Sequence, residues 1–345
     1  MKITFILVGD ARSGGVKAPI QVASLLLERG HDIRLLVNHI KTSLKESIRA
    51  LSLRIRYPHS LSWLHLFKGK IEKFVDLTRC EFENNEIVVA HGWWAKRELQ
   101  RLREPKIIKV HYIHGVASRD LVKDAWSENV PKIAVASYLE GVVKEVCNQE
   151  VLAVIPNGID TKEFFPSVPQ NDRDGVGTIF GMSYHKDPQT VLEVLEQLHR
   201  TRPEIPLRIF GACRKPKEIP CRIYHRLPSM EKAREIYSRS LVWFIGSRSE
   251  GFSVPVLEAM ACGCAVVATD CGGPRDMIQD GVNGFLCEVG NVEQIVEKIQ
   301  ILLEDEVLRK RFVRESQKTI QEFSWERSVD KLEKILLEIN QACKR

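Results

Sequence analysis

The sequence lacks the features of a membrane-spanning or disulfide-built protein. No apolar run approaches the ~18 consecutive residues that a membrane-spanning helix requires. The 9 cysteines are dispersed over 345 residues and no two CxxC pairs occur, which argues against a disulfide scaffold. The sequence contains no short repeat and no low-complexity tract, and its composition argues against a collagen-like, coiled-coil or disordered chain.

The first residues also lack the pattern of an export signal. Met1–Gly9 contains one Lys and a short apolar stretch that Asp10 ends, which fits a buried first strand better than a secretory signal. We therefore expect reduced thiols and a cytoplasmic location.

Charge is unevenly distributed along the chain. The whole sequence has 51 Lys+Arg and 45 Asp+Glu, a formal net charge of +6. Residues 1–165 hold 25 basic and 19 acidic residues, whereas residues 166–345 hold 26 of each, so the first half carries the whole excess. Within Arg34–Lys73 there are 9 basic and 2 acidic residues. Such a region either attracts nucleic acid, an anionic membrane or a phosphorylated ligand, or is a solvated basic face.

The sequence shows a regular alternation of apolar strand-like runs and helical patterns, which predicts parallel sheets with helices on both faces. The strand-like runs are Lys2–Val8, Ile33–Val37, Ile87–Ala90, Ile107–Tyr112, Ile133–Ala136, Leu152–Ile155, Thr178–Gly181, Leu207–Phe210, Cys221–Tyr224, Leu241–Ile245 and Ala265–Ala268. The helical patterns are Ala18–Arg29, Pro188–Arg200, Met230–Arg239, Pro255–Cys262, Val292–Glu304, Glu306–Ile320 and Glu326–Gln341.

A seam between two domains follows Ile155. Pro156–Pro169 holds three prolines, and the next eight residues are polar and contain two glycines. We expect an N-terminal α/β domain over residues 1–165, a C-terminal one over 170–325, and a closing helix at about 326–345 that packs back on the N-terminal domain. Ligands of such sheets bind beyond the carboxyl ends of the strands, so the two domains are expected to face each other across a cleft.

The densest chemical signal lies in Gly246–Leu286. A predicted strand leads into a loop with Glu250 and Gly251, and the helix that follows carries Glu258. Two carboxylates so placed can hold vicinal hydroxyl groups, and the free N–H groups of the helix start can receive an anion. The turn Gly272–Gly273 offers a second binding site for a phosphate group. The alternative is that either carboxylate serves only to stabilise the helix.

Four groups of residues carry a family resemblance. They are Gly14–Val16 with Leu25–His31 and Ile33; Ile155–Asp160 with Phe164–Pro166; Glu250–Gly273; and Phe323–Glu326. In this order, over nearly the whole chain, they resemble the retaining glycosyltransferases of family 4 (glycosyl transferases group 1). The resemblance implies the GT-B fold, an α/β architecture of two Rossmann-like, doubly wound parallel-sheet domains.

The resemblance also implies roles in the C-terminal domain. Glu258 matches the carboxylate that holds the ribose hydroxyls of a nucleotide, and Glu250 matches the one that contacts the donor sugar. The backbone of Gly251, Phe252 and Ser253 lies beside the sugar and diphosphate in that family. Lys186 matches its diphosphate-binding lysine.

Three residues of the N-terminal domain match as well. Gly14 and Gly15 correspond to a loop that approaches the donor phosphates, and His114 lies where the family often has a histidine near the transferred sugar. Without the resemblance, a single histidine after a strand is more often structural.

The sequence departs from the family at Met182. Arg usually follows the glycine that matches Gly181, and it supplies a second cation to the diphosphate. The absence of this arginine leaves three possibilities: another cation takes its place, the loop aligns differently with the family, or the activity is weak. Arg12, Arg226 and Arg248 are the candidates for substitution.

The implied reaction needs no metal ion and no cofactor. Cleavage of a sugar–diphosphate bond develops positive charge on the sugar and negative charge on the leaving group, which Lys186 and the loop amides would stabilise. No carboxylate on the N-terminal side is an obvious nucleophile, so we expect retention by same-face attack, with a donor phosphate oxygen taking the acceptor's proton.

Four other signals carry less weight. Asp172–Asp174 has the DxD form of metal-dependent transferases but lies in the polar linker, and Cys262–Cys264 is better explained by packing than by zinc or redox chemistry. Gly9–Gly15 lacks the GxGxxG spacing of a dehydrogenase. Basic residues near Trp63 and Trp93 resemble a nucleic-acid surface, but no nucleic-acid-binding module is visible.

The segment Leu61–Lys73 places apolar and basic side chains together. It either packs under a long loop or forms a surface for an anionic membrane or a lipid-pyrophosphate acceptor.

The sequence as a whole predicts a retaining hexosyl- or glycosyltransferase of the Leloir type. Its expected partners are a nucleotide-sugar donor and a glycan or anionic lipid-linked acceptor in cell-surface polysaccharide or glycoconjugate synthesis, with peripheral contact at the cytoplasmic face of a membrane and no nucleic acid. The alternatives are a non-catalytic nucleotide-sugar-binding subunit, or a phosphorylase or epimerase on the same fold.

Overall fold

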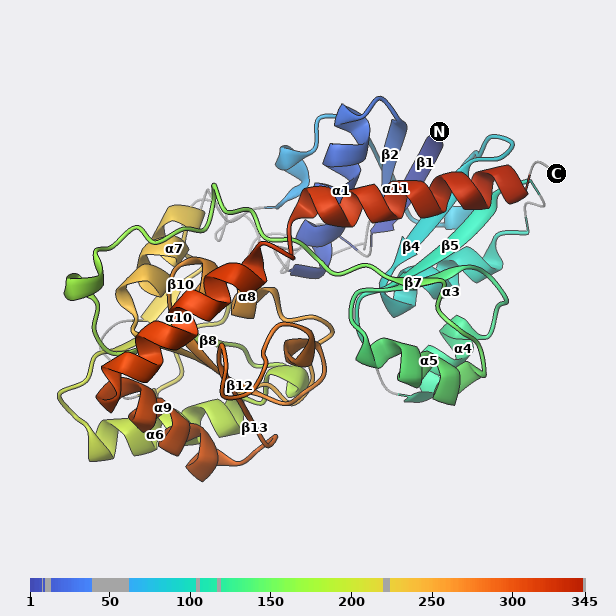
Figure 1. Cartoon of the computed structure of the whole chain (residues 1–345). Coiled ribbons are helices and arrows are strands. Elements are labelled where there is room, and N and C mark those ends of the chain that lie inside the picture. Colours follow the sequence, from blue (N-terminus) through green and yellow to red (C-terminus); the bar gives the residue numbers. More distant parts are fainter. Residues whose placement is uncertain are drawn as a thin grey trace. The chain divides into compact units, whose positions relative to one another are not determined.

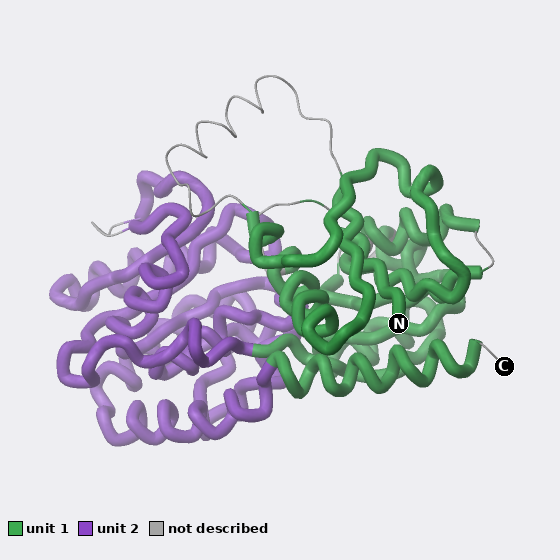
Figure 2. Tube along the Cα trace, turned by 90° about the horizontal axis from the view of Figure 1, so that it is seen from above, with its two compact units in different colours: residues 1–158, 325–345 green, residues 159–324 purple. Residues whose placement is uncertain are grey.

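The structure is a computed structural model of the chain, and it describes residues 1–7, 9, 14–38, 62–103, 106–116, 119–219 and 224–343. Two compact units are distinguished in Figure 2. Unit 1 combines Met1–Gly158 with Trp325–Arg345, and unit 2 is Ile159–Ser324.

Unit 1 is built on a parallel sheet that has, among the described residues, 7 strands in the order β3-β2-β1-β4-β5-β6-β7. Strand β1 is apolar at four of its six positions and its side chains from Ile3 to Leu7 are buried, as expected for a strand covered on both faces. The strands are β1 (Lys2–Leu7), β2 (Asp32–Asn38), β3 (Lys70–Phe74), β4 (Ile87–His91), β5 (Ile108–Ile113), β6 (Lys132–Ala134) and β7 (Ala153–Val154).

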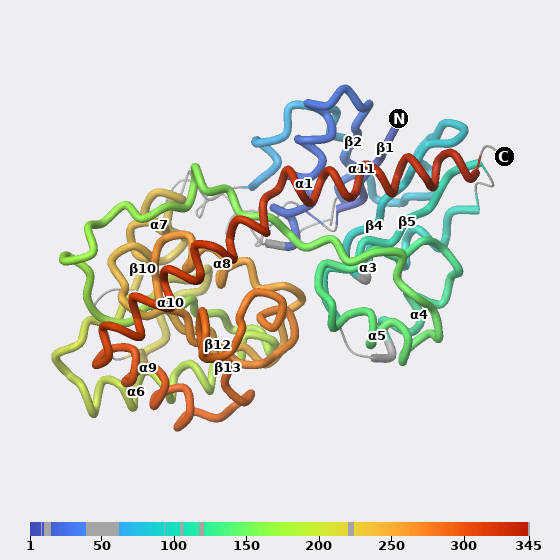
Figure 3. Tube along the Cα trace, in the orientation of Figure 1, coloured from blue at the N-terminus to red at the C-terminus, as the bar shows by residue number. Residues whose placement is uncertain are grey.

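The described helices of unit 1 are α1 (Gly14–Glu28), α3 (Gly92–Arg101), α4 (Arg119–Trp126), α5 (Tyr138–Cys147) and α11 (Trp325–Ala342). The last helix of the chain, α11, lies beside the first, α1, as the red and blue segments in Figures 1 and 3 show. Arg29, just after α1, forms ion pairs with Asp330 at 2.7 Å and Glu333 at 2.6 Å, both on α11. The closing helix is therefore part of unit 1, although it follows unit 2 in the chain.

Unit 2 contains a second parallel sheet, with 6 strands in the described residues and the order β10-β9-β8-β11-β12-β13. Its strands are β8 (Val176–Phe180), β9 (Leu207–Gly211), β10 (Tyr224–Arg226), β11 (Val242–Ile245), β12 (Ala265–Thr269) and β13 (Phe285–Cys287). Its described helices are α6 (Pro188–Thr201), α7 (Met230–Arg239), α8 (Val254–Ala261), α9 (Val292–Glu304) and α10 (Glu306–Ile320).

Both faces of the unit 2 sheet are covered, which explains why its strands are apolar at consecutive positions. On β11, Val242 and Phe244 belong to a core cluster with side chains of α6 and α9. The intervening Trp243 points to the opposite face, where its ring lies 4.1 Å from that of Tyr237 on α7. All strand pairs run parallel, so the carboxyl ends of β8, β11 and β12 lie at one edge of the sheet.

The predicted architecture of two α/β domains with parallel sheets is confirmed. The predicted spans of α7, α9 and α10 match the structure residue for residue, and each predicted strand overlaps an observed one. Of the predicted strand Cys221–Tyr224, only Tyr224 lies within the described residues, where β10 begins.

The observed division of the chain falls in the predicted seam after Ile155 but differs from the expected domain bounds. We assigned residues 1–165 to the N-terminal domain, whereas the structure divides the two units after Gly158. The reason is that Ile159 donates its N–H to the carbonyl of Phe323 at 2.8 Å, and Phe164 packs with its ring 6.0 Å from that of Tyr237. Both contacts hold residues 159–165 on unit 2.

None of the helices in the described ranges has the length and apolarity needed to cross a membrane.

Candidate functional site

The residues singled out in the C-terminal half lie at the carboxyl edge of the unit 2 sheet. Lys186 ends a short 3₁₀ turn (Tyr184–Lys186) after β8, and Glu250 lies in the loop after β11. Gly272 and Gly273 follow β12, and Glu258 lies on α8. Parallel strands bring these loops together, which is where α/β sheets bind ligands.

The centre of this edge is an ion pair. Lys186 Nζ lies 2.6 Å from Glu250 Oε1, which also accepts a hydrogen bond of 2.6 Å from the hydroxyl of Ser247. Glu250 is only 8% exposed, so its charge needs these partners. The structure thus brings together two predicted site residues that are 64 positions apart.

Backbone hydrogen bonds join the Glu250 loop to the glycine turn. The N–H of Glu250 donates to the carbonyl of Cys271 at 3.1 Å, and the N–H of Gly273 donates to the carbonyl of Glu250 at 3.0 Å. A side chain at position 273 would collide with the main chain of Phe252. Glycine is therefore required where the two loops approach each other.

The start of α8 carries an unsatisfied polar group. Ser253 precedes the helix with φ +74°, a left-handed conformation that is unfavourable for a residue with a side chain. Ser253 is buried, and its hydroxyl has no hydrogen-bond partner among the described residues. A buried hydroxyl without a partner at the start of a helix is suited to donate a hydrogen bond to an anion.

Glu258 lies one turn into α8 and is oriented by a tyrosine. The hydroxyl of Tyr237 donates a hydrogen bond of 2.9 Å to Glu258 Oε2. Burial raises the pKa of Tyr237, and the carboxylate of Glu258 raises it further, so this hydroxyl stays protonated and remains a donor. The contact holds the carboxylate in one orientation.

Met182 and the candidate replacement cations occupy different places. Met182 is 63% exposed and supplies no charge. Arg226 lies on the edge strand β10 and donates from Nε to the carbonyl of Ala212 at 3.2 Å. Arg248 lies two positions before Glu250 and pairs with Asp187 at 2.8 Å, whereas Arg12 lies outside the described residues.

In unit 1, His114 follows β5 and forms a pair with His91, the last residue of β4. His91 Nδ1 and His114 Nε2 are 2.8 Å apart, and the two rings also contact Tyr112. Burial lowers the pKa of His114 to about 3 and that of His91 well below its usual range, so both rings are neutral at pH 7. Gly14 and Gly15 begin α1 in the same unit.

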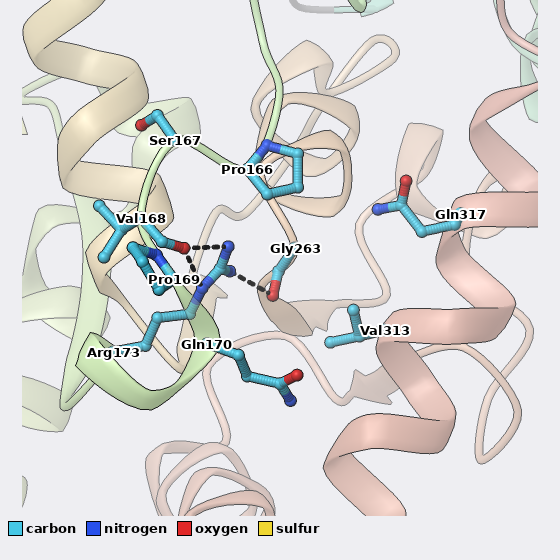
Figure 4. A pocket seen from close by; sticks show the side chains of 9 residues that line it. All are labelled: Pro166, Ser167, Val168, Pro169, Gln170, Arg173, Gly263, Val313 and Gln317. Atoms are coloured by element: carbon cyan, nitrogen blue, oxygen red, sulfur yellow. Dashed lines mark hydrogen bonds between the residues drawn. The ribbon is translucent and has the colours of Figure 1, made fainter.

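The segment Asp172–Asp174 has a structural role. The guanidinium of Arg173 donates to the carbonyls of Val168, Cys262 and Gly263, as the dashed lines to Val168 and Gly263 in Figure 4 show. These residues precede β8 and β12, so they lie at the amino edge of the sheet, where a cavity of about 630 Å³ opens. No cluster of three metal-binding side chains occurs in the described part of the chain.

Cys262 and Cys264 are packing residues. Both are buried, and Cys264 Sγ lies 3.0 Å from the carbonyl oxygen of Tyr237. Burial raises the pKa of the Cys262 thiol to about 12, so it is not a thiolate at neutral pH.

Our sequence reasoning missed four residues of these sites: Ser247, Asp187, Tyr237 and His91. Ser247 and Asp187 adjoin predicted site residues, so their position in the loops was a usable signal. Tyr237 gave none, because its contact with Glu258 depends on how α7 packs beside α8.

Comparisons with known proteins relate the chain to glycosyltransferases. Residues 160–319 match the family model described as Glycosyl transferases group 1. An uncharacterized glycosyltransferase of Haemophilus influenzae is 23% identical over 366 residues, which cover 97% of this chain and 99% of that protein. The N,N'-diacetylbacillosaminyl-diphospho-undecaprenol alpha-1,3-N-acetylgalactosaminyltransferase of Campylobacter jejuni is 39% identical over 85 residues, which cover 25% of this chain and 23% of that protein.

A solved structure extends the likeness to the whole fold. Anabaena Alr3699/HepE in complex with UDP and glucose has a TM-score of 0.76 and 17% identity, with 98% of this chain and 100% of that chain covered. The two parallel sheets and this neighbour establish the fold, and the sequence relatives support a glycosyltransferase. The chain therefore has the GT-B fold, and its C-terminal unit matches the glycosyl transferases group 1.

Proposed function

We propose that the protein is a retaining, metal-independent glycosyltransferase of family 4, which transfers a sugar from a nucleotide-sugar donor to a glycan or lipid-linked acceptor. The observation that carries this proposal is the Lys186–Glu250 pair at 2.6 Å, placed beside the glycine turn and the start of α8. A cation, a buried carboxylate and the hydroxyl of Ser253, unpartnered in the described part of the chain, together suit the charges and the oxygen atoms of a sugar–diphosphate.

In the proposed site, each group meets one part of the donor. Glu258, oriented by Tyr237, accepts hydrogen bonds from the ribose hydroxyls, and the backbone of Gly251–Ser253 lies along the sugar and diphosphate. Lys186 stabilises the negative charge that develops on the departing diphosphate. This stabilisation lowers the barrier to cleavage of the bond between the sugar and the diphosphate. Glu250 holds that ammonium group in place and contacts the sugar.

Retention in this scheme comes from attack on the same face of the sugar, without a covalent intermediate on a protein nucleophile. The acceptor hydroxyl attacks the face that the diphosphate leaves, and a phosphate oxygen of the donor takes its proton. His114, which is neutral at pH 7, forms a hydrogen bond with the sugar rather than an ion pair with the phosphates.

The acceptor is expected to be anionic or lipid-linked, because unit 1 carries the basic excess of the chain. The Campylobacter relative, by its name, acts on a diphospho-undecaprenol, which supports a lipid-linked acceptor. Three exposed apolar side chains on and beside the edge strand β3 (Leu66, Ile71 and Val75) lie close in sequence to Lys68, Lys70 and Lys73. We propose that this surface touches an anionic membrane on its cytoplasmic face.

A donor screen tests the enzyme proposal. The protein is incubated with EDTA, an acceptor mixture and UDP-, GDP-, ADP- or dTDP-sugars, and the anomeric configuration of the product is read by NMR. The expected result is transfer from one nucleotide class with retention, and its loss in Glu258→Ala. Inversion of configuration, or transfer that requires a divalent metal, would contradict the proposal.

The exposed Met182 favours a second candidate, a subunit that binds nucleotide sugars without turnover, because the usual second cation is missing at that position. Binding of a donor in calorimetry, with neither transfer nor slow donor hydrolysis, would support this alternative.

Flotation with liposomes tests the proposed membrane contact. The protein should bind to anionic vesicles, and this binding should weaken as the salt concentration increases.

A further inference from the structure

Asp187 adopts a backbone conformation that suits glycine better than aspartate. Its φ is +43° and its ψ is +67°, and the residue is 3% exposed. Left-handed backbone is unfavourable for a residue with a Cβ, and such strain persists where the side chain has a use. Aspartate often precedes a helix to cap it, but Asp187 makes no side-chain capping bond to α6.

The use of this side chain is to hold Arg248. Asp187 Oδ2 accepts hydrogen bonds from Arg248 Nε at 3.2 Å and from Nη2 at 2.8 Å. The guanidinium also lies 4.6 Å from the centre of the Tyr184 ring, and the N–H of Arg248 donates to the carbonyl of His185 at 2.8 Å. Three residues of one short loop thus fix the position of a single arginine.

Two ion pairs therefore connect the same two loops in opposite directions. Lys186, on the loop after β8, pairs with Glu250 on the loop after β11. Arg248, on the loop after β11, pairs with Asp187 on the loop after β8. Each loop contributes one cation and one carboxylate, and the two cations are held at the same edge of the sheet.

We propose that Arg248 is the second diphosphate-binding cation of this protein, and that Asp187 is its positioning residue. This inference rests on the proposed function. It explains how the site tolerates Met182, which lies four positions before Lys186 and carries no charge. Arg226 is a weaker candidate, since it lies on β10, two strands away from β8 in the sheet.

Calorimetry with the full-length protein tests the role of Arg248. The probes are UDP, GDP, ADP, dTDP and the matching nucleotide sugars. Arg248→Ala is expected to weaken binding of the preferred diphosphate by about ten- to a hundred-fold and to reduce the salt dependence of binding. Arg202→Ala is the matched control: it removes an arginine paired with Glu204 and Glu304 before β9, at the opposite edge, and should leave affinity unchanged.

A rescue experiment separates charge from folding. Met182→Arg restores a cation at the family position, so the double variant Met182→Arg/Arg248→Ala should recover most of the lost affinity. Asp187→Gly relieves the left-handed backbone, so its Tm should not fall, while affinity for the diphosphate drops because Arg248 is no longer held.

The outcomes distinguish the two proposals. If the wild-type protein binds none of the diphosphates, the proposed function fails and this inference fails with it. If the wild type binds but Arg248→Ala binds equally well, or Asp187→Gly keeps full affinity, only the role of Arg248 and Asp187 is overturned. A fall in the Tm of Arg248→Ala with unchanged affinity identifies a structural pair and also overturns the inference.

Discussion

The two edges of the unit 2 sheet differ in how their polar groups are used. At the amino edge, Arg173 satisfies three backbone carbonyls and Arg208 pairs with Asp174, beside a cavity of about 630 Å³. At the carboxyl edge, charged groups pair across loops, and the hydroxyl of Ser253 has no partner among the described residues.

Backbone strain shows the same asymmetry. Three residues of unit 2 other than glycine have positive φ in the described ranges: Asp187, Leu227 and Ser253. They follow β8, β10 and β11, so all three lie in loops that leave the carboxyl ends of strands. Among the described residues of unit 2, strained backbone other than glycine therefore lies at the edge where we propose that the donor binds.

The largest effect is expected from Lys186 at the carboxyl edge. Lys186→Ala removes the cation that stabilises the leaving diphosphate and should lower the transfer rate by about 10²–10³-fold. Arg208→Ala, which breaks an ion pair at the amino edge, should change the rate little. Measuring initial rates of both variants with the preferred donor tests the asymmetry; equal losses would break it.

Gly273→Ala should affect both folding and activity. The added Cβ collides with the main chain of Phe252, so the glycine turn must move away from the Glu250 loop. We expect a loss of about 1–3 kcal/mol in unfolding free energy, together with at least a ten-fold loss of transfer. Gly281→Ala is the control. Gly281 has a φ of +71°, which is unfavourable for alanine, but an added Cβ would meet no neighbouring atom, so this variant should keep its activity.

Arg173→Ala should give the opposite pattern at the amino edge. It leaves three carbonyls without their donor, which should reduce the free energy of unfolding by about 1–3 kcal/mol. Chemical denaturation and donor calorimetry on the same sample check this prediction. Loss of donor affinity with intact stability would show that the cavity in Figure 4 takes part in binding.

A further prediction concerns the histidine pair of unit 1 and the dependence of stability on pH. The pKa of His114 is lowered from 6.5 to about 3 by burial, so the folded state binds fewer protons than the unfolded state between these values. The free energy of unfolding should therefore be retained above pH 6.5 and fall as the pH drops toward 3. His114→Asn should flatten this dependence in urea titrations, whereas the exposed His199→Asn should not.

Much of unit 2 could be predicted from the sequence because its strands are buried on both faces and read as continuous apolar runs. The strand β3 was not predicted, since it lies at a sheet edge and alternates charged and apolar residues, as in Lys70, Ile71 and Glu72. Its sequence favoured an amphipathic surface segment, which describes its exposed side chains but not its backbone.

The site could be predicted only in part. Motif spacing placed Glu250 and Glu258 near a helix start, because strand, loop and helix are consecutive in the chain. The partners that orient them are distant in sequence: Lys186 reaches Glu250, and Tyr237 reaches Glu258, only after the strands and helices have packed. The exchange of ion pairs between two loops likewise has no local sequence pattern.

Hydrogen–deuterium exchange tests whether the carboxyl edge of the unit 2 sheet binds the donor. The full-length protein is compared with and without the nucleoside diphosphate that calorimetry selects. We predict slower exchange in residues 181–187, 246–254 and 270–273, with no change around Arg173 and Gly263. Protection confined to the amino-edge cavity, or to unit 1 alone, would show that the donor does not bind at the carboxyl edge.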